Sequence, residues 1–133
     1  AAIATAVKDS GVDVLMGVGG GPQGALAAAA LKSMGGDMQG RFLPRNDAEY
    51  GRVRHLALRE TNQILTIDDM IRGGDVLFVA TGITDGDVLK GVRFSGKGAA
   101  THSLAIHGKA GTIRLIRTEH RFLPFNAGER PPV

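Results

Sequence analysis

The stretch of this sequence best suited to chemistry is a glycine-rich segment, Gly17-Val-Gly-Gly-Gly-Pro-Gln-Gly24, set between an apolar run and an alanine-rich one. A turn of this kind between a strand and a helix leaves backbone N–H groups free at the positive end of the helix dipole. Glycine has no Cβ atom, so a ligand can approach the main chain closely. The segment is therefore a candidate phosphate or sugar-phosphate site. A glycine turn that merely lets a strand and a helix pack together has the same composition.

The segment also contains the spacing Gly19-x-Gly21-x-x-Gly24, which occurs in dinucleotide-binding turns. Those turns are normally followed, about 20 residues later, by an acidic residue at the end of the second strand. Phe42-Leu-Pro44 occupies that place here, and the sequence lacks the Gly-Lys-Ser/Thr of a P-loop. A nucleotide-dependent oxidoreductase domain therefore has only the glycine spacing in its support.

A second polar cluster, Thr-Gly-Ile-Thr-Asp-Gly-Asp at residues 81–87, follows the apolar run 75–80. Ligands of open α/β sheets bind outside the carboxyl ends of strands. Asp85 and Asp87 are therefore candidate ligands for Mg²⁺ or Mn²⁺, which prefer carboxylate oxygen. The interpretation we favour is that they cap turns by accepting hydrogen bonds from nearby N–H groups.

The histidines show no metal-ligand or catalytic spacing. His102 and His107 are five residues apart on one expected strand, so they face opposite sides of it. Ser103 lacks the context of a nucleophile elbow, so acyl transfer has no support. Surface or structural roles are expected for all four histidines, His55, His102, His107 and His120. Most of the scattered basic residues are expected to be ordinary surface residues, and one or two of them are candidates to face a phosphate; they are Lys32, Arg41, Arg45, Lys90, Arg93 and Lys97.

The composition is that of a globular domain or part of one. The 133 residues are 43% hydrophobic and include no cysteine, which excludes disulfides and thiolate metal sites and agrees with a cytoplasmic location. The net charge of +3 is dispersed, so no nucleic-acid partner is expected. We expect no membrane span, because no apolar run approaches the necessary ~18 residues. Neither a leader peptide nor an initiating Met is visible.

A β-α-β unit is expected to position the glycine turn. Residues 1–9 resemble the end of a helix. The short β-branched run 12–18 predicts a buried strand. Residues 22–34 predict a helix with a proline in its first turn and an alanine face for close packing. Residues 38–43 then predict a second strand, parallel to the first across a right-handed crossover.

The rest of the chain predicts one further helix, a capped turn and antiparallel strands. Asn46 or Asp47 is expected to N-cap a helix that continues to about Arg59. Residues 66–69 have the pattern of a capping box. Extended segments are expected at 63–65, 75–80, 92–94, 101–107 and 112–117, with hairpin loops at 95–98 and 108–111. Residues 1–122 are expected to form an α/β domain, and residues 123–133 a disordered tail.

Several long motifs together resemble the class II fructose-1,6-bisphosphatases of bacteria. The glycine turn stands within the first of them, and another is Ala80-Thr-Gly-Ile-Thr-Asp-Gly-Asp87. The resemblance extends in order over about residues 1–120, through residues 13–32, 34–41, 43–47, 65–73, 80–93 and 101–114, with His120.

This resemblance implies that the chain is the C-terminal segment of a metal-dependent phosphatase. The family hydrolyses the 1-phosphate of fructose 1,6-bisphosphate to give fructose 6-phosphate, in gluconeogenesis and glycerol metabolism. It implies Mn²⁺ or Mg²⁺ as cofactor, sedoheptulose 1,7-bisphosphate as a related substrate, a homo-oligomer and a cytoplasmic location. The implied fold is the layered α/β sandwich of the sugar-phosphatase (inositol-phosphatase-like) type. Most metal carboxylates of the family belong to its N-terminal part, so this segment is expected to be inactive alone.

Two functional positions of the family fall on residues of this sequence. Gly20 matches the glycine whose backbone contacts the substrate. Gln23 stands where the family has a metal-ligating glutamate, and its amide brings no negative charge. No catalytic residue is assigned within the segment. The alternative is a non-catalytic paralogue or module that binds sugar phosphates. The glutamine at this position is the reason for considering it.

Overall fold

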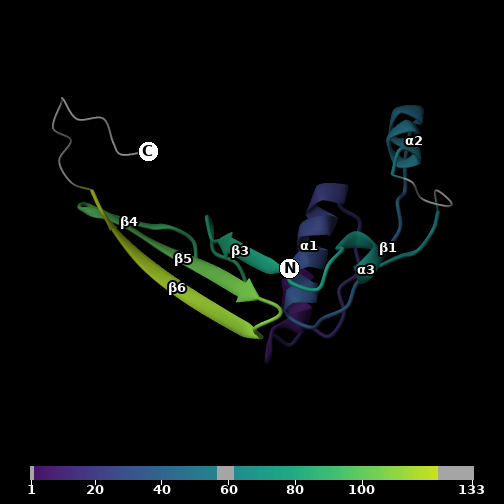
Figure 1. Cartoon of the computed structure of the whole chain (residues 1–133). Helices are drawn as coiled ribbons and strands as arrows, with labels where there is room; N and C mark the ends of the chain where they lie inside the picture. Colours follow the sequence, from purple (N-terminus) through teal and green to yellow (C-terminus); the bar gives the residue numbers. More distant parts are fainter. Residues whose placement is uncertain (1, 57–61, 123–133) are drawn as a thin grey trace. The chain divides into compact units, whose positions relative to one another are not determined.

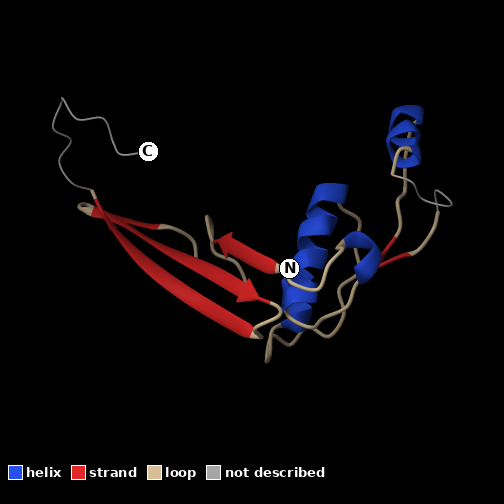
Figure 2. Cartoon of the chain, viewed as in Figure 1, coloured by secondary structure: helices blue, strands red, loops and turns tan. Residues whose placement is uncertain are grey.

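The computed structural model describes residues 2–56 and 62–122 (Figure 1). It divides into two compact units, one formed by Ala1–Phe78 with Ile106–Ile113 and the other by Val79–Ala105 with Arg114–Val133. The first unit holds the helices and a small sheet, whereas the second consists mainly of strands and loops (Figure 2). The glycine-rich segment lies in the first unit, and the 81–87 cluster lies in the second.

The main helix of the first unit, α1 (Gly21–Ser33), follows the glycine turn as predicted. Pro22 stands in its first turn, where a missing N–H group costs no hydrogen bond. The helix ends in a glycine cap, in which the N–H of Gly36 donates to the carbonyl oxygen of Leu31 at 2.9 Å. Gly35 supports this ending with a φ of 75°, a left-handed conformation that favours glycine.

Small side chains on α1 allow it to pack closely. Ala28, Ala30 and Leu31 are buried, and α1 contacts the N-terminal element η1 (Ala2–Ala6). The buried Ser33 hydroxyl donates to the carbonyl oxygen of Ala30 at 2.7 Å, so its polar atom is paired. The helix end predicted at 1–9 is therefore present, but it is a short 3-10 helix.

The predicted β-α-β unit is wrong within the described part of the chain. Segment 38–43 contains only the two-residue strand β1 (Gln39–Gly40), which pairs antiparallel with β2 (Leu65–Thr66). A right-handed crossover unit needs a strand that pairs with β1 in parallel. The strand that pairs with β1 in this structure is β2, and the pairing is antiparallel. β2 leads directly into α3 (Ile67–Met70), which has the predicted capping box.

The buried strand predicted at residues 12–18 does not form. The segment has no strand assignment, and its side chains include Leu15, 48% exposed, and Met16, 91% exposed. A strand needs a partner for its backbone N–H and C=O groups. Among the described residues no strand pairs with this segment, so its β-branched composition has nothing to pack against.

The charged helix α2 (Asp47–Arg54) begins as predicted. The Asn46 side chain accepts a hydrogen bond from the Glu49 N–H at 3.0 Å, which satisfies a free donor of the first turn. Its predicted continuation to Arg59, like the predicted tail 123–133, lies outside the described residues.

The larger sheet has the order β3-β5-β4, with β6 also paired to β5. Its strands are β3 (Leu77–Thr81), β4 (Arg93–Ser95), β5 (Gly98–His107) and β6 (Thr112–Arg121). β4 and β5 form the first predicted hairpin, antiparallel with Ser95 opposite Gly98. The second hairpin, β5–β6, is also present as predicted.

The buried residues of this sheet lie mainly on β5, its central strand. Ala99, Ala100, Leu104 and Ile106 are buried there, whereas β6 is exposed along most of its length. The chain is thus a mixed α/β structure with antiparallel sheets. Within residues 2–56 and 62–122, no helix combines the length and apolar character that crossing a membrane requires.

Candidate functional site

The glycine turn ends at Gly20, the N-cap residue of α1. Gly20 is extended, with φ −71° and ψ 149°, and no side chain caps the helix there. Its carbonyl oxygen accepts the first helical hydrogen bond, from Gly24 N–H at 3.0 Å. No acidic residue lies in the first turn of α1, so the positive end of the helix dipole is open to an anion. The turn is exposed and is suited to bind phosphate.

The structure brings together Gly20 and Gln23, the two site residues predicted from the sequence. A Cβ atom built on Gly20 would collide with the amide oxygen of Gln23, so this side chain folds back over the Gly20 main chain. Gln23 is the third residue of α1, from which a Glu or Gln side chain characteristically reaches back to the N-cap residue. Replacing Gly20 therefore forces Gln23 to move.

Phe42 is a neighbour of the glycine turn that no sequence motif predicts. A Cβ atom built on Gly21 would lie 3.7 Å from Cε1 of Phe42, so the ring lies beside the first residue of α1. Phe42 follows β1 and is half-buried. Apolar residues are usually part of a core, so no sequence pattern pointed to this contact.

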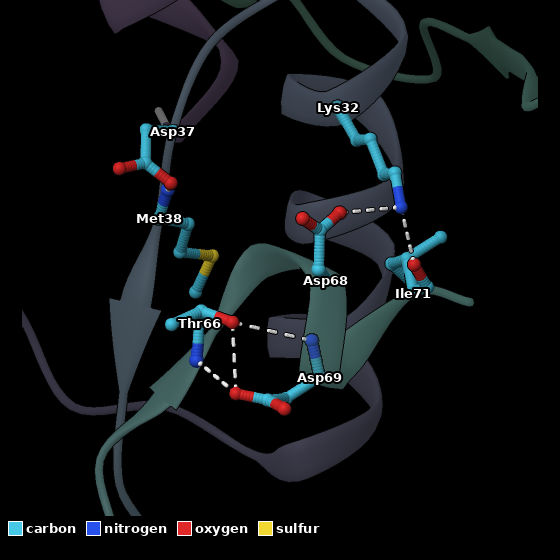
Figure 3. A network of polar contacts seen from close by, with 7 residues as sticks. All are labelled: Lys32, Asp37, Met38, Thr66, Asp68, Asp69 and Ile71. Atoms are coloured by element: carbon cyan, nitrogen blue, oxygen red, sulfur yellow. Dashed lines mark hydrogen bonds and ion pairs between the residues drawn. The ribbon is translucent and has the colours of Figure 1, made fainter. Parts of the chain in front are cut away.

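A polar network occupies the other end of α1 (Figure 3). Lys32 Nζ donates to the carbonyl oxygen of Ile71 at 2.6 Å and lies 2.8 Å from Oδ1 of Asp68. In the adjoining capping box, Thr66 N–H donates to Oδ2 of Asp69 at 2.8 Å. This hydrogen bond, with a further one from the Thr66 hydroxyl, lowers the pKa of Asp69. Lys32, one of the candidate phosphate-facing residues, is thus already bonded within the protein.

In the aspartate cluster of the second unit, Asp85 accepts hydrogen bonds that hold the loop of residues 81–93 together. Oδ1 and Oδ2 of Asp85 accept from Nη2 of Arg93 at 2.8 and 2.6 Å, and Oδ1 also accepts from the Gly91 N–H at 2.9 Å. The Arg93 hydrogen bond, followed by the Gly91 one, lowers the pKa of Asp85. The favoured prediction of a turn-capping aspartate is therefore confirmed for Asp85. Asp87 is exposed and does not join this network.

Backbone crowding makes this loop tight. A Cβ atom on Gly91 would approach the carbonyl carbon of Thr84 to 2.7 Å. The N–H of Val92 donates to the carbonyl oxygen of Ile83 at 3.1 Å. The loop therefore holds its form through main-chain contacts as well as through the Asp85–Arg93 pair.

Three of the histidines lie on β5 and β6, and two of them have hydrogen-bond partners that are not histidines. His107 Nε2 lies 2.8 Å from Oδ1 of Asp75, and His120 Nε2 lies 3.0 Å from the Thr101 hydroxyl. His102 is half-buried, with no hydrogen-bond partner for Nδ1 in the described structure. Ser103 bonds the Thr81 hydroxyl at 2.8 Å, not a histidine.

The donor set of the described residues does not fit a complete metal centre. Nowhere in residues 2–56 and 62–122 do three or more His, Asp or Glu side chains gather in a way that could hold a metal ion. Gln23 offers one neutral oxygen at the glycine turn. These residues therefore do not by themselves hold Mn²⁺ or Mg²⁺.

Comparison with known proteins identifies the relatives of the chain. The family model for bacterial fructose-1,6-bisphosphatase, glpX-encoded, matches residues 1–120. The class 2 fructose-1,6-bisphosphatase of Haemophilus influenzae is 40% identical over 127 residues, covering 86% of this chain and 38% of that protein. The fructose-1,6-bisphosphatase 1 class 2 of Escherichia coli strain K12 is 41% identical over 133 residues, covering 90% and 39% respectively.

The chain spans about two fifths of the length of these curated relatives. Its glycine turn, capping box and Asp85 loop all lie within the matched residues 1–120. The family expected from the motifs is thereby confirmed, and the chain belongs to the bacterial class 2 fructose-1,6-bisphosphatases.

Proposed function

We propose that this chain is the C-terminal segment of an enzyme that hydrolyses fructose 1,6-bisphosphate to fructose 6-phosphate and inorganic phosphate, consuming one water molecule. The observation that carries the proposal is the match over residues 1–120 to fructose-1,6-bisphosphatases. The exposed glycine turn supports it, because it presents an uncapped helix N-terminus to an anionic substrate.

In this proposal Gly20 and the first turn of α1 bind the substrate. The helix dipole at Gly20 favours the negative charge of a sugar phosphate. The Gln23 amide oxygen occupies the space that a Cβ atom of Gly20 would fill, so a substrate that reaches this main chain displaces the Gln23 side chain. The segment thus contributes binding and orientation, and we place no proton-transfer or nucleophilic step on its residues.

Mn²⁺ or Mg²⁺ dependence is part of the proposal, with most ligands supplied by residues outside these 133. The mixed α/β structure with antiparallel sheets supports a wider layered fold of the sugar-phosphatase type. Action on sedoheptulose 1,7-bisphosphate, a role in gluconeogenesis and glycerol metabolism, homo-oligomerisation and a cytoplasmic location stay predictions that rest on the family resemblance.

The alternative of a non-catalytic binding module is not favoured, because the matched relatives bear the names of enzymes. The glycine spacing is likewise accounted for by this family, which removes the reason for an oxidoreductase domain.

The direct test uses the complete open reading frame that encodes these residues. The purified protein is incubated with fructose 1,6-bisphosphate and Mn²⁺, and inorganic phosphate is measured while NMR identifies the sugar product. We expect phosphate release with fructose 6-phosphate as product. Release of fructose 1-phosphate, or binding without turnover, would contradict the proposal.

The isolated 133-residue chain provides a second test. We expect no phosphate release from it, because its described residues do not gather a metal-binding donor set. Metal-dependent phosphate release by this chain alone would contradict this expectation, because it would show that these 133 residues contain enough metal ligands for catalysis.

A further inference from the structure

The Lys32 network joins two helices that are far apart in sequence. Its two partners, Asp68 and Ile71, belong to α3 and the residue that ends it. The Lys32 side chain is 20% exposed, whereas that of Asp68 is 81% exposed. An ion pair with so exposed a partner is weak, so the charge-assisted hydrogen bond to the Ile71 carbonyl is the stronger tie.

α3 is itself fixed at both ends. Its start is held by the capping box between Thr66 and Asp69, and its end is held by Lys32 at the Ile71 carbonyl (Figure 3). Between them, Met70 reaches β1: a Cβ atom on Gly40 would lie 3.1 Å from its Cε atom. The short helix therefore connects the last turn of α1 to β1.

β1 leads in turn to the other end of α1. Two residues beyond Gly40, the Phe42 ring lies beside Gly21, the first residue of the helix. The contacts run from Lys32 through α3 and β1 to Phe42 and back to α1. All of these residues belong to the first compact unit.

A helix transmits a tilt at one end to the other end. Lys32 and Gln23 are nine residues apart, which corresponds to about 14 Å along the helix axis. A tilt of roughly 4° at the Lys32 end therefore moves the first turn by about 1 Å. A misplacement of about 1 Å is enough to slow a reaction markedly.

We propose that Lys32 is a positioning residue, which fixes α1 through α3 and so holds the Gly20–Gln23 turn beside Phe42. This inference rests on the proposed function of that turn. Lys32 itself touches no reacting atom, and its role is distinct from the phosphate contact considered for it on sequence grounds.

The test compares Lys32→Met, Lys32→Arg and Lys109→Met in the complete open reading frame. Methionine keeps an unbranched side chain of similar size but has no hydrogen-bond donor, and arginine restores a charged donor. Lys109 is a matched control, because it is an exposed lysine of the same unit. Hydrogen exchange of the Gly24 amide, which donates to the Gly20 carbonyl oxygen at 3.0 Å, is measured alongside kcat and KM for fructose 1,6-bisphosphate.

We expect Lys32→Met to lower kcat about tenfold, with KM changed less, because the turn is displaced and not removed. Exchange of the Gly24 amide should accelerate, because its hydrogen bond to Gly20 opens more often. Lys32→Arg should recover activity to within about threefold of wild type, and Lys109→Met should match wild type in both measurements. A Lys32→Met protein with wild-type exchange and kcat would overturn the proposal.

Two other outcomes, an inactive wild-type protein and a Lys32→Met protein that does not fold, also have a defined interpretation. If the wild-type protein does not hydrolyse fructose 1,6-bisphosphate, the proposed function fails, and the exchange data still test the positioning. If Lys32→Met does not fold, Met70→Ala replaces it, because it removes the contact through which α3 reaches Gly40. Unchanged exchange of the Gly24 amide in Met70→Ala would then overturn the proposal.

Discussion

Residues 12–18 include three valines yet form no strand, whereas β5 (Gly98–His107), whose apolar residues are mostly alanine, is a strand. β5 has paired strands from the same chain, and two of them are joined to it by tight hairpin loops. The 12–18 segment has no such partner among the described residues. The comparison shows that strand propensity becomes a strand only where another segment satisfies its backbone.

The side chains of the two segments also differ in how far they are buried. Leu104 in β5 is 3% exposed, whereas Leu15 in the unpaired segment is 48% exposed. Burial of apolar area is the main stabilising contribution of such residues. The two leucines should therefore differ sharply in what they contribute to the free energy of unfolding.

The largest expected effect comes from truncating these two leucines. Leu104→Ala should lower the free energy of unfolding of the 133-residue chain by about 2–4 kcal/mol, because it removes a buried side chain and leaves a cavity. Leu15→Ala should change it by less than about 1 kcal/mol. Urea unfolding followed by circular dichroism measures both, and equal effects would mean that the 12–18 segment is packed after all.

The second effect contrasts two glycines outside these segments. Gly91→Ala should cost about 1–3 kcal/mol, since its new Cβ atom would meet the Thr84 backbone. Gly74→Ala is the control, because a Cβ atom there meets nothing within 4 Å. Thermal unfolding of the two variants side by side gives the comparison. A neutral Gly91→Ala would show that the loop is not closed through its main chain.

A smaller effect is expected at the cap of α2, a second case where a local pattern suffices. Asn46→Ala should cost about 1 kcal/mol, because the Glu49 N–H loses its acceptor. Asn46→Asp keeps an acceptor and should retain most of the stability. Far-ultraviolet circular dichroism during urea unfolding measures both, and a destabilised Asn46→Asp would argue against the cap.

The smallest effect is expected at Asp85, and it depends on pH. Its pKa is lowered in the folded state by Arg93 and Gly91, so its contribution is complete above the unfolded pKa of about 3.9 and is lost as pH falls through the lower folded value. Asp85→Asn should therefore reduce the unfolding temperature slightly at pH 7, and this reduction should shrink as the pH is lowered below about 3.9. Asp87→Asn, at an exposed residue outside the network, is the control, and an Asp85→Asn deficit that does not shrink at low pH would contradict this account.

The elements that the sequence predicted are those with a local cause. The proline and glycines around α1, the Asn46 cap, the 66–69 capping box and the β4–β5 turn all act within a few residues. The β1–β2 pairing joins residues about 25 positions apart in the sequence, and no local pattern specifies it. The apparent β-α-β unit was inferred from apolar runs that fit either arrangement.

In the candidate site, too, only the contacts between residues close in sequence were predictable. Gly20 and Gln23 are three residues apart at a helix start, so their closeness follows from local geometry. The Lys32 network and the Phe42 contact join separate segments and required the structure. The aspartates of residues 81–87 were candidates for a metal site, although turn capping was favoured, and the positions of Arg93 and the Gly91 N–H identified the role of Asp85.

The most direct test of the central claim is the phosphatase activity of the complete open reading frame, compared between wild type and Gln23→Glu over a range of Mn²⁺ concentrations. We expect both proteins to release phosphate from fructose 1,6-bisphosphate, with Gln23→Glu reaching half-maximal activity at a Mn²⁺ concentration about tenfold lower, because it adds a negative oxygen donor. Absence of phosphate release from both would contradict the assignment of this turn to a working phosphatase, and activity in Gln23→Glu alone would identify the natural protein as a disabled one.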